Sequence, residues 1–152
     1  MELIAADIGG TKSRLAWLTD TPEAPPQLRF EQVYASTGFA TADDLIRQFI
    51  TDARAETAPD CLLLALPGPV DAQHVRLTNL DWTLDAADMQ ATLGIARVRF
   101  INDFQAAAEG VATLAADDLV ALNARTAEAG GVRAITGAGT GLGLAFMLAD
   151  AD

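Results

Sequence analysis

Apolar and polar residues alternate along the chain in short blocks that predict a succession of strands. An unbroken apolar run such as Leu62–Leu66 is typical of a strand in the interior of a sheet. The pattern predicts strands over residues 3–8, 12–19, 29–35, 61–66, 98–101, 132–136 and 144–149. Gly9 and Gly10 predict a turn between the first two strands, and the prolines of residues 21–26 predict a turn or loop.

Helical spacing appears in separate segments between these strands. Apolar residues from Leu45 to Ile50 recur at helical intervals, which predicts a helix over residues 42–57 with Thr41 as its N-cap and an end before Pro59. Asp85 and Gly94 have the residue types that begin and end a short helix over residues 86–93.

Three weaker patterns complete the expected element order. Residues 70–78 predict an irregular hairpin, an alanine-rich helix is expected after Asn102-Asp103 to about residue 113, and Asp117 and Asp118 predict one more helical turn. The whole pattern is that of an α/β protein that opens on a β-hairpin instead of a helical crossover.

The composition excludes some functions and restricts others. The chain of 152 residues has a formal net charge of −11, which argues against nucleic-acid binding because a nucleic-acid interface needs a basic surface. An anionic ligand would need backbone N–H groups, a cation and locally placed arginine or lysine. No apolar run has the length of a membrane helix. Cys61, which is expected to be a buried thiol, suits a reducing cytoplasm.

The segment "DIGGT", residues 7–11, admits two interpretations. Gly9 and Gly10 lack Cβ atoms and can adopt positive φ, which allows successive backbone N–H groups to converge on an anion. Thr11 adds a hydroxyl donor, and Asp7 could hold a hydrated Mg²⁺ beside a phosphate. The alternative is an ordinary tight hairpin turn. The segment is not a P-loop, because the lysine pattern of that motif is absent.

A second glycine-rich segment, "GAGTGLG" at residues 137–143, also lies between two predicted strands. It is not a dinucleotide-binding fingerprint, because Leu142 stands at the third glycine position and a strand rather than a helix is predicted next. A glycine-rich turn is the simple interpretation. Two such loops in one chain favour a phosphate clamp formed by two related half-structures.

The segment "FINDF", residues 100–104, places a carboxylate where a predicted strand ends and a helix begins. Ligands of open α/β sheets bind at such strand ends. Asp103 could therefore act as a general base on a substrate hydroxyl, with Asn102 hydrogen-bonded to a neighbouring hydroxyl. The alternative is that one of these two residues only caps the following helix.

Five motifs together resemble the N-terminal part of bacterial glucokinases, which belong to the hexokinase/actin-like ATPase superfamily. They are "DIGGTKSRLAWL", "LPGPV", "LTNLDW", "FINDF" and "TGAGTGLGLAFM", in the family's order. The resemblance implies an α/β fold of the actin-like ATPase (ribonuclease H-like) type. Residues 1–113 would form a small lobe with a mixed sheet, an opening β-hairpin and flanking helices. Residues 114–152 would form a linker helix and the first hairpin of a second lobe.

The resemblance also implies roles for individual residues in the transfer of phosphate from ATP to the 6-hydroxyl of glucose. Asp103 corresponds to the catalytic base and Asn102 to a sugar-binding neighbour. Asp7 would lie near Mg²⁺ and bind it through water. The nucleotide-binding positions would be Ala6, Asp7, Ile8, Gly9, Gly10 and Thr11 in the first phosphate loop, and Gly139, Thr140 and Gly141 in the second.

Two departures from the family limit what is expected of this chain. Leu80 stands where the family often has a histidine, and the family's further sugar ligands and adenine site lie downstream of "GAGTGLG". We therefore expect an incomplete N-terminal part that is inactive alone and self-associates, as a homodimer or otherwise, through its exposed apolar strand at 144–149. The alternatives are a kinase for another sugar with the same base, or a non-catalytic module that senses nucleotide or sugar.

Overall fold

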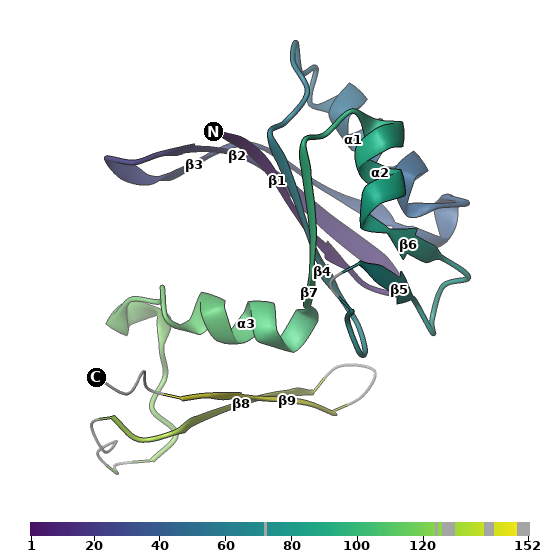
Figure 1. Ribbon diagram of the computed structural model, residues 1–152. Coiled ribbons are helices and arrows are strands. Elements are labelled where there is room, and N and C mark those ends of the chain that lie inside the picture. Colours follow the sequence, from purple (N-terminus) through teal and green to yellow (C-terminus); the bar gives the residue numbers. More distant parts are fainter. Residues whose placement is uncertain (72, 124, 126–129, 139–141, 149–152) are drawn as a thin grey trace. The chain divides into compact units, whose positions relative to one another are not determined.

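The computed structural model divides the chain into two compact units, residues 1–103 and 104–152 (Figure 1). It describes all residues except 72, 124, 126–129, 139–141 and 149–152. None of the helices within the described ranges has the length and apolar character that a bilayer crossing requires. The predicted domains, 1–113 and 114–152, remain a prediction.

The first unit is built on a five-stranded mixed sheet in the order β3-β2-β1-β4-β7. β1, β2 and β3 form an antiparallel meander, whereas β4 and β7 run parallel to β1. The α/β fold with a mixed sheet that opens on a hairpin is thereby confirmed. The bounds are β1 (Glu2–Ile8), β2 (Lys12–Thr21), β3 (Ala24–Ala35), β4 (Cys61–Leu66) and β7 (Arg97–Asn102).

One face of this sheet is covered by α1 (Ala42–Asp52) and α2 (Ala86–Leu93), which lie on the same side of it (Figure 1). The strand register explains which residues this face contains, because side chains two positions apart share a face. Ile4 lies opposite Trp17 and Leu62, and Leu62 lies opposite Val98. All four are buried in one hydrophobic core that also includes residues of both helices.

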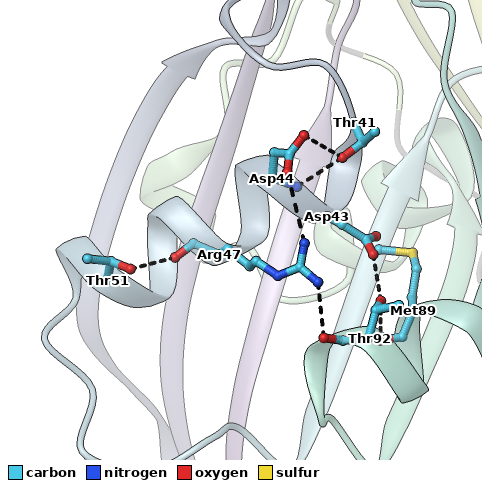
Figure 2. A network of polar contacts seen from close by, with 7 residues as sticks. All are labelled: Thr41, Asp43, Asp44, Arg47, Thr51, Met89 and Thr92. Carbon is cyan, nitrogen blue, oxygen red and sulfur yellow. Dashed lines mark hydrogen bonds and ion pairs between the residues drawn. The ribbon is translucent and has the colours of Figure 1, made fainter.

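Helix α1 begins and α2 ends within one network of polar contacts (Figure 2). The Thr41 hydroxyl accepts a hydrogen bond from the Asp44 N–H at 3.1 Å, which confirms Thr41 as the N-cap. Arg47 of α1 donates to the Thr92 carbonyl oxygen of α2 at 3.1 Å, and the Thr92 hydroxyl donates to Asp43 at 2.6 Å. These bonds fix the two helices against one another above the sheet.

A small two-stranded sheet of β5 (His74–Arg76) and β6 (Thr83–Asp85) precedes α2. The hairpin therefore spans residues 74–85, and the prediction of a hairpin over residues 70–78 was wrong in its second strand. Asp85 caps α2 by accepting from the Asp88 N–H at 2.8 Å. Gly94, with φ of 68°, ends α2 as predicted.

Two boundaries in the first unit differ from the predicted ones. Residues 24–26 belong to β3 and not to a loop, because β3 is an edge strand and can accommodate prolines that donate no ladder hydrogen bond. Helix α1 ends at Asp52, five residues early, since Arg54 adopts the left-handed conformation with φ of 51°.

The Cys61 side chain is only half-buried, and not buried as predicted, because it lies on the sheet face opposite the two helices.

The second unit contains a helix and a two-stranded antiparallel sheet. Helix α3 (Asp103–Val111) starts at the last residue of the first unit and is followed by a short 3₁₀ turn, η2 (Ala116–Asp118). The strands are β8 (Arg133–Ala138) and β9 (Leu142–Met147).

Phe104 packs against the two glycines that face each other across this hairpin, Gly137 and Gly143. A Cβ at Gly137 would lie 3.2 Å from the Phe104 ring, and one at Gly143 would overlap the ring. These two glycines are therefore explained by close packing within the second unit.

Candidate functional site

The hairpin turn between β1 and β2 contains the residues that the sequence predicts to bind phosphate. The Gly9 N–H donates to the Lys12 carbonyl oxygen at 3.0 Å, which closes the turn. A Cβ at Gly9 would lie 2.7 Å from that same oxygen, and one at Gly10 would lie 2.8 Å from the Asn79 Cβ. Both distances are shorter than real Cβ contacts, so both positions require glycine.

The positive φ expected at these two glycines is absent, whereas the missing Cβ atoms matter as the sequence predicts. Neither Gly9 nor Gly10 has a positive φ; the glycines of the described chain that do are Gly68, Gly94 and Gly130. What the sequence pattern reflects is the close approach of Lys12 on one side and Asn79 on the other.

Two buried serines support this turn from the interior of the first unit. The Ser36 hydroxyl donates to the Gly9 carbonyl oxygen at 2.6 Å, and the Ser36 N–H donates to the Thr11 carbonyl oxygen at 3.0 Å. The Ser13 and Ser36 hydroxyl oxygens are 2.8 Å apart, and both residues are fully buried. The predicted site did not include either serine.

Two carboxylates come together beside the turn. Asp7 of β1 is in register with Ala65 of β4, which is in register with Ile101 of β7, and Asp103 follows two residues later. Burial raises the pKa of Asp7, and the negative charge of Asp103 raises this pKa further, whereas Arg14 lowers it. Parallel strands thus bring two predicted site residues within electrostatic reach, although 95 residues separate them in sequence.

Arg14 lies directly opposite Asp7 in the β1–β2 pair. Its guanidinium is also 3.2 Å from Glu31 of β3, and both of these side chains are substantially exposed. The positive charge next to Asp7 is therefore shared with a second carboxylate. Arg14 therefore compensates the charge of Asp7 only in part, which agrees with the raised pKa of Asp7.

Asn102, the last residue of β7, connects the strand end to a neighbouring turn. Its side-chain amide donates to the Gly68 carbonyl oxygen at 2.9 Å. Gly68 has φ of 91° and lies in the Pro67-Gly68-Pro69 turn that follows β4. The predicted sugar-binding residue is thus oriented by the turn after the central parallel strand.

The segment from Arg76 to Asp81 borders the same region of the first unit. It lines an open hollow of about 460 Å³ and includes Asn79, the residue that approaches Gly10, as well as Leu80. A larger hollow of about 650 Å³ lies near Trp17 and Arg54 and shares none of the predicted site residues. The size of a hollow therefore does not identify the candidate site, and the positions of Asp7, Asp103 and the glycine turn do.

The second predicted phosphate loop, Gly139, Thr140 and Gly141, lies outside the described residues. Ala6 and Ile8 are buried in β1 and can contribute only backbone groups to a ligand.

Among the residues that the structure describes, no group of three or more His, Cys, Asp or Glu side chains forms a metal-binding cluster. Asp7 nevertheless fits Mg²⁺ bound through water, since Mg²⁺ commonly binds one or two carboxylates together with waters and phosphate.

Asp7→Asn is expected to raise the free energy of unfolding at pH 7 by about 0.5 kcal/mol, a small gain because solvent screens this partly exposed carboxylate. A carboxyl group whose pKa is raised by folding favours the folded state only while it is protonated. Its contribution to stability is present below the unfolded pKa, near 3.8, and is lost as the pH rises through the folded pKa. The gain from the substitution should therefore appear as the pH rises from 3.8.

Urea unfolding at a series of pH values measures this effect. Asp81→Asn is a matched control, because it removes the same charge from an exposed carboxylate that forms only a long ion pair with Arg76. An equal gain in both variants would attribute the effect to net charge and would contradict its assignment to the burial of Asp7 and its repulsion by Asp103.

Comparison with known proteins identifies relatives along nearly the whole chain. The family model described as "Glucokinase" matches residues 4–152. A glucokinase from Synechocystis sp. is 38% identical over 97% of this chain, and a glucokinase from Saccharophagus degradans is 34% identical over 98% of it. The chain spans 44% and 46% of the lengths of these two relatives.

A solved structure shares the fold over the same extent. The crystal structure of a glucokinase from an Antarctic psychrotroph matches 97% of this chain with a TM-score of 0.81 and 28% identity, and the match covers 46% of that protein.

Proposed function

The chain belongs to the glucokinase family, and on that premise we propose that the protein transfers the terminal phosphoryl group of ATP to the 6-hydroxyl of glucose. The observation that carries the proposal is that the strand order places Asp7 and Asp103 within electrostatic reach of each other, with Asp7 two residues before the glycine turn at residues 9–12. One carboxylate would accept a proton there, and the other would lie next to the bound phosphates. A general base and a phosphate-binding turn in one place are the two parts that a sugar kinase needs.

Asp103 is proposed to be the general base. Its carboxylate would accept the proton of the sugar hydroxyl while the hydroxyl oxygen forms a bond to the γ-phosphorus and the bond to the β-phosphate oxygen breaks, which releases ADP. Asn102, already oriented by the Gly68 carbonyl, would bind an adjacent hydroxyl and orient the sugar. Backbone N–H groups of Gly10 and Thr11 are proposed to bind the phosphates.

Asp7 is proposed to hold Mg²⁺ through water. A divalent cation there would neutralise charge on the phosphates, and it would also compensate the repulsion that raises the pKa of Asp7. Gly139, Thr140 and Gly141 remain proposed as the second set of phosphate contacts.

A solved relative of the same fold supports the choice of ligands. A glucokinase of the ROK family from Streptomyces griseus was solved with glucose and AMPPNP, and it matches 98% of this chain with a TM-score of 0.69 at 22% identity, over 45% of its own length. That likeness supports the fold, and the two ligands bound in that structure motivate glucose and an ATP analogue as the first ligands to test.

Turnover is best tested in a joined chain, because the chain spans less than half of its relatives. Residues 1–152 would be fused to the C-terminal part of the Synechocystis glucokinase that follows the matched region. We expect Mg²⁺-dependent release of ADP that glucose stimulates in the joined chain, and no turnover from residues 1–152 alone. Turnover with a different sugar only would replace glucose by another substrate, and binding without turnover would favour a sensing module.

Self-association and location are further proposals. Leu142 and Phe146 of β9 are 80% and 63% exposed, and exposed apolar strands favour association between copies. We therefore propose that residues 1–152 form dimers or larger assemblies through the hairpin of the second unit. A cytoplasmic location and the absence of nucleic-acid partners, both based on composition, are proposed with it.

A further inference from the structure

Two carbonyl groups of the turn at residues 9–12, those of Gly9 and Thr11, are held by a single buried residue. Ser36 is not part of the predicted site. Its hydroxyl nevertheless donates a hydrogen bond to the Gly9 carbonyl oxygen, and its N–H donates one to the Thr11 carbonyl oxygen. Ser36 lies 25 residues after Thr11 in sequence, at the start of the 3₁₀ turn η1 (Ser36–Gly38). Two alternate carbonyls of the turn are thus fixed toward the interior by one residue.

The direction of each hydrogen bond follows from the chemistry of the groups. A carbonyl oxygen only accepts, so the single hydroxyl proton of Ser36 is directed to Gly9. Ser36 therefore accepts from the Ser13 hydroxyl, and the chain of donation runs from Ser13 to Ser36 to Gly9. Both hydroxyls are fully buried, where an ordered chain of this kind strengthens each of its bonds.

The orientation of one carbonyl determines that of the next N–H. The Gly9 carbonyl and the Gly10 N–H belong to one planar trans peptide group and point in opposite directions. With the carbonyl held by Ser36, the Gly10 N–H is turned away from the buried serines. Because glycines on both sides make the rotation of this peptide group sterically easy, a fixed partner is needed to keep the N–H in one direction.

We infer that Ser36 is a positioning residue that aims the Gly10 N–H at the phosphate of the nucleotide, an inference that rests on the proposed phosphate-binding role of this turn. Serine hydroxyls that served packing alone would contribute to stability without any effect on the direction of the Gly10 N–H. The two roles therefore predict different outcomes when each serine is replaced.

Ser36→Ala and Ser13→Ala form a matched pair of variants of the 152-residue chain. Both remove one hydroxyl from the same buried pair, but only Ser36→Ala removes the bond to the Gly9 carbonyl. Residual dipolar couplings report the direction of the Gly10 N–H vector without any ligand. We expect this vector to change in Ser36→Ala and to stay as in the wild type in Ser13→Ala, even if both variants unfold more readily in urea.

Titration of the joined chain and of its two serine variants with MgATP, followed by the amide resonances of Gly9, Gly10 and Thr11, tests the link to phosphate. We expect about a tenfold or greater loss of affinity in Ser36→Ala, which corresponds to at least about 1.4 kcal/mol, and less than a threefold loss in Ser13→Ala. An unchanged Gly10 vector in Ser36→Ala, or equal changes in both variants, would overturn the positioning role. If MgATP left all three resonances of the parent joined chain unmoved, the proposed nucleotide site itself would be rejected. The proposal that the Gly10 N–H points at the phosphate would be rejected with it.

Discussion

Asp103→Asn in the joined chain is expected to lower kcat for glucose phosphorylation by about 10²–10⁴-fold, the usual contribution of a general base. Asparagine is nearly the same size as aspartate but cannot accept the proton of the sugar hydroxyl at neutral pH. The KM for ATP should change little, because Asp103 is assigned to the sugar hydroxyl and not to the phosphates. Steady-state kinetics with glucose and ATP varied in turn measure both parameters.

The control for Asp103→Asn is Asp81→Asn, which removes an exposed carboxylate from the loop that approaches Gly10. It should retain the activity of the parent chain. Equal losses in both variants would mean that net charge in this region, and not proton transfer, limits the reaction. Full activity in Asp103→Asn would exclude it as the base and would leave the helix-capping interpretation of this residue.

The fold was predictable wherever local chemistry determined the outcome. The inward positions of β1 alternate as Ile4, Ala6 and Ile8, and this period of two is visible in the sequence. Thr41 and Gly94 begin and end helices through contacts within one turn of their own position, so their residue types were sufficient evidence.

Boundaries that depend on tertiary position were not predictable in the same way. Pro25 and Pro26 suggest a loop, and only the position of β3 at the edge of the sheet allows them to lie in a strand. The early end of α1 depends on the left-handed conformation of Arg54, a residue type that rarely indicates it.

The candidate site was partly predictable for the same reason. Asp103 and "DIGGT" could be singled out because a carboxylate at a strand end and a double glycine are unusual, but the order β1-β4-β7 is what brings Asp7 toward Asp103. Ser13 carried a weak signal, since it is a polar residue on the inward face of β2 beside Leu15. Ser36 carried none, because its partner in the turn is distant in sequence.

Gly9→Ala is expected to lower the free energy of unfolding by about 1–3 kcal/mol, the usual cost of overpacking, and to weaken MgATP binding at least about tenfold. The new Cβ would lie 2.7 Å from the Lys12 carbonyl oxygen, which is a backbone atom held by the bond that closes the turn. Relief of this overlap must displace the same peptide groups that are proposed to bind phosphate.

Gly38→Ala is the matched control for Gly9→Ala, because a Cβ at Gly38 would meet no atom within 4 Å and Gly38 is not at positive φ. Urea unfolding followed by the fluorescence of the buried Trp17 and Trp82 measures stability, and calorimetric titration of the joined chain measures MgATP affinity. Gly38→Ala should leave both quantities near those of the parent. A Gly9→Ala variant that bound MgATP as tightly as the parent would show that this turn does not contact the phosphates, because the added methyl group must displace the peptide groups around the Lys12 carbonyl oxygen.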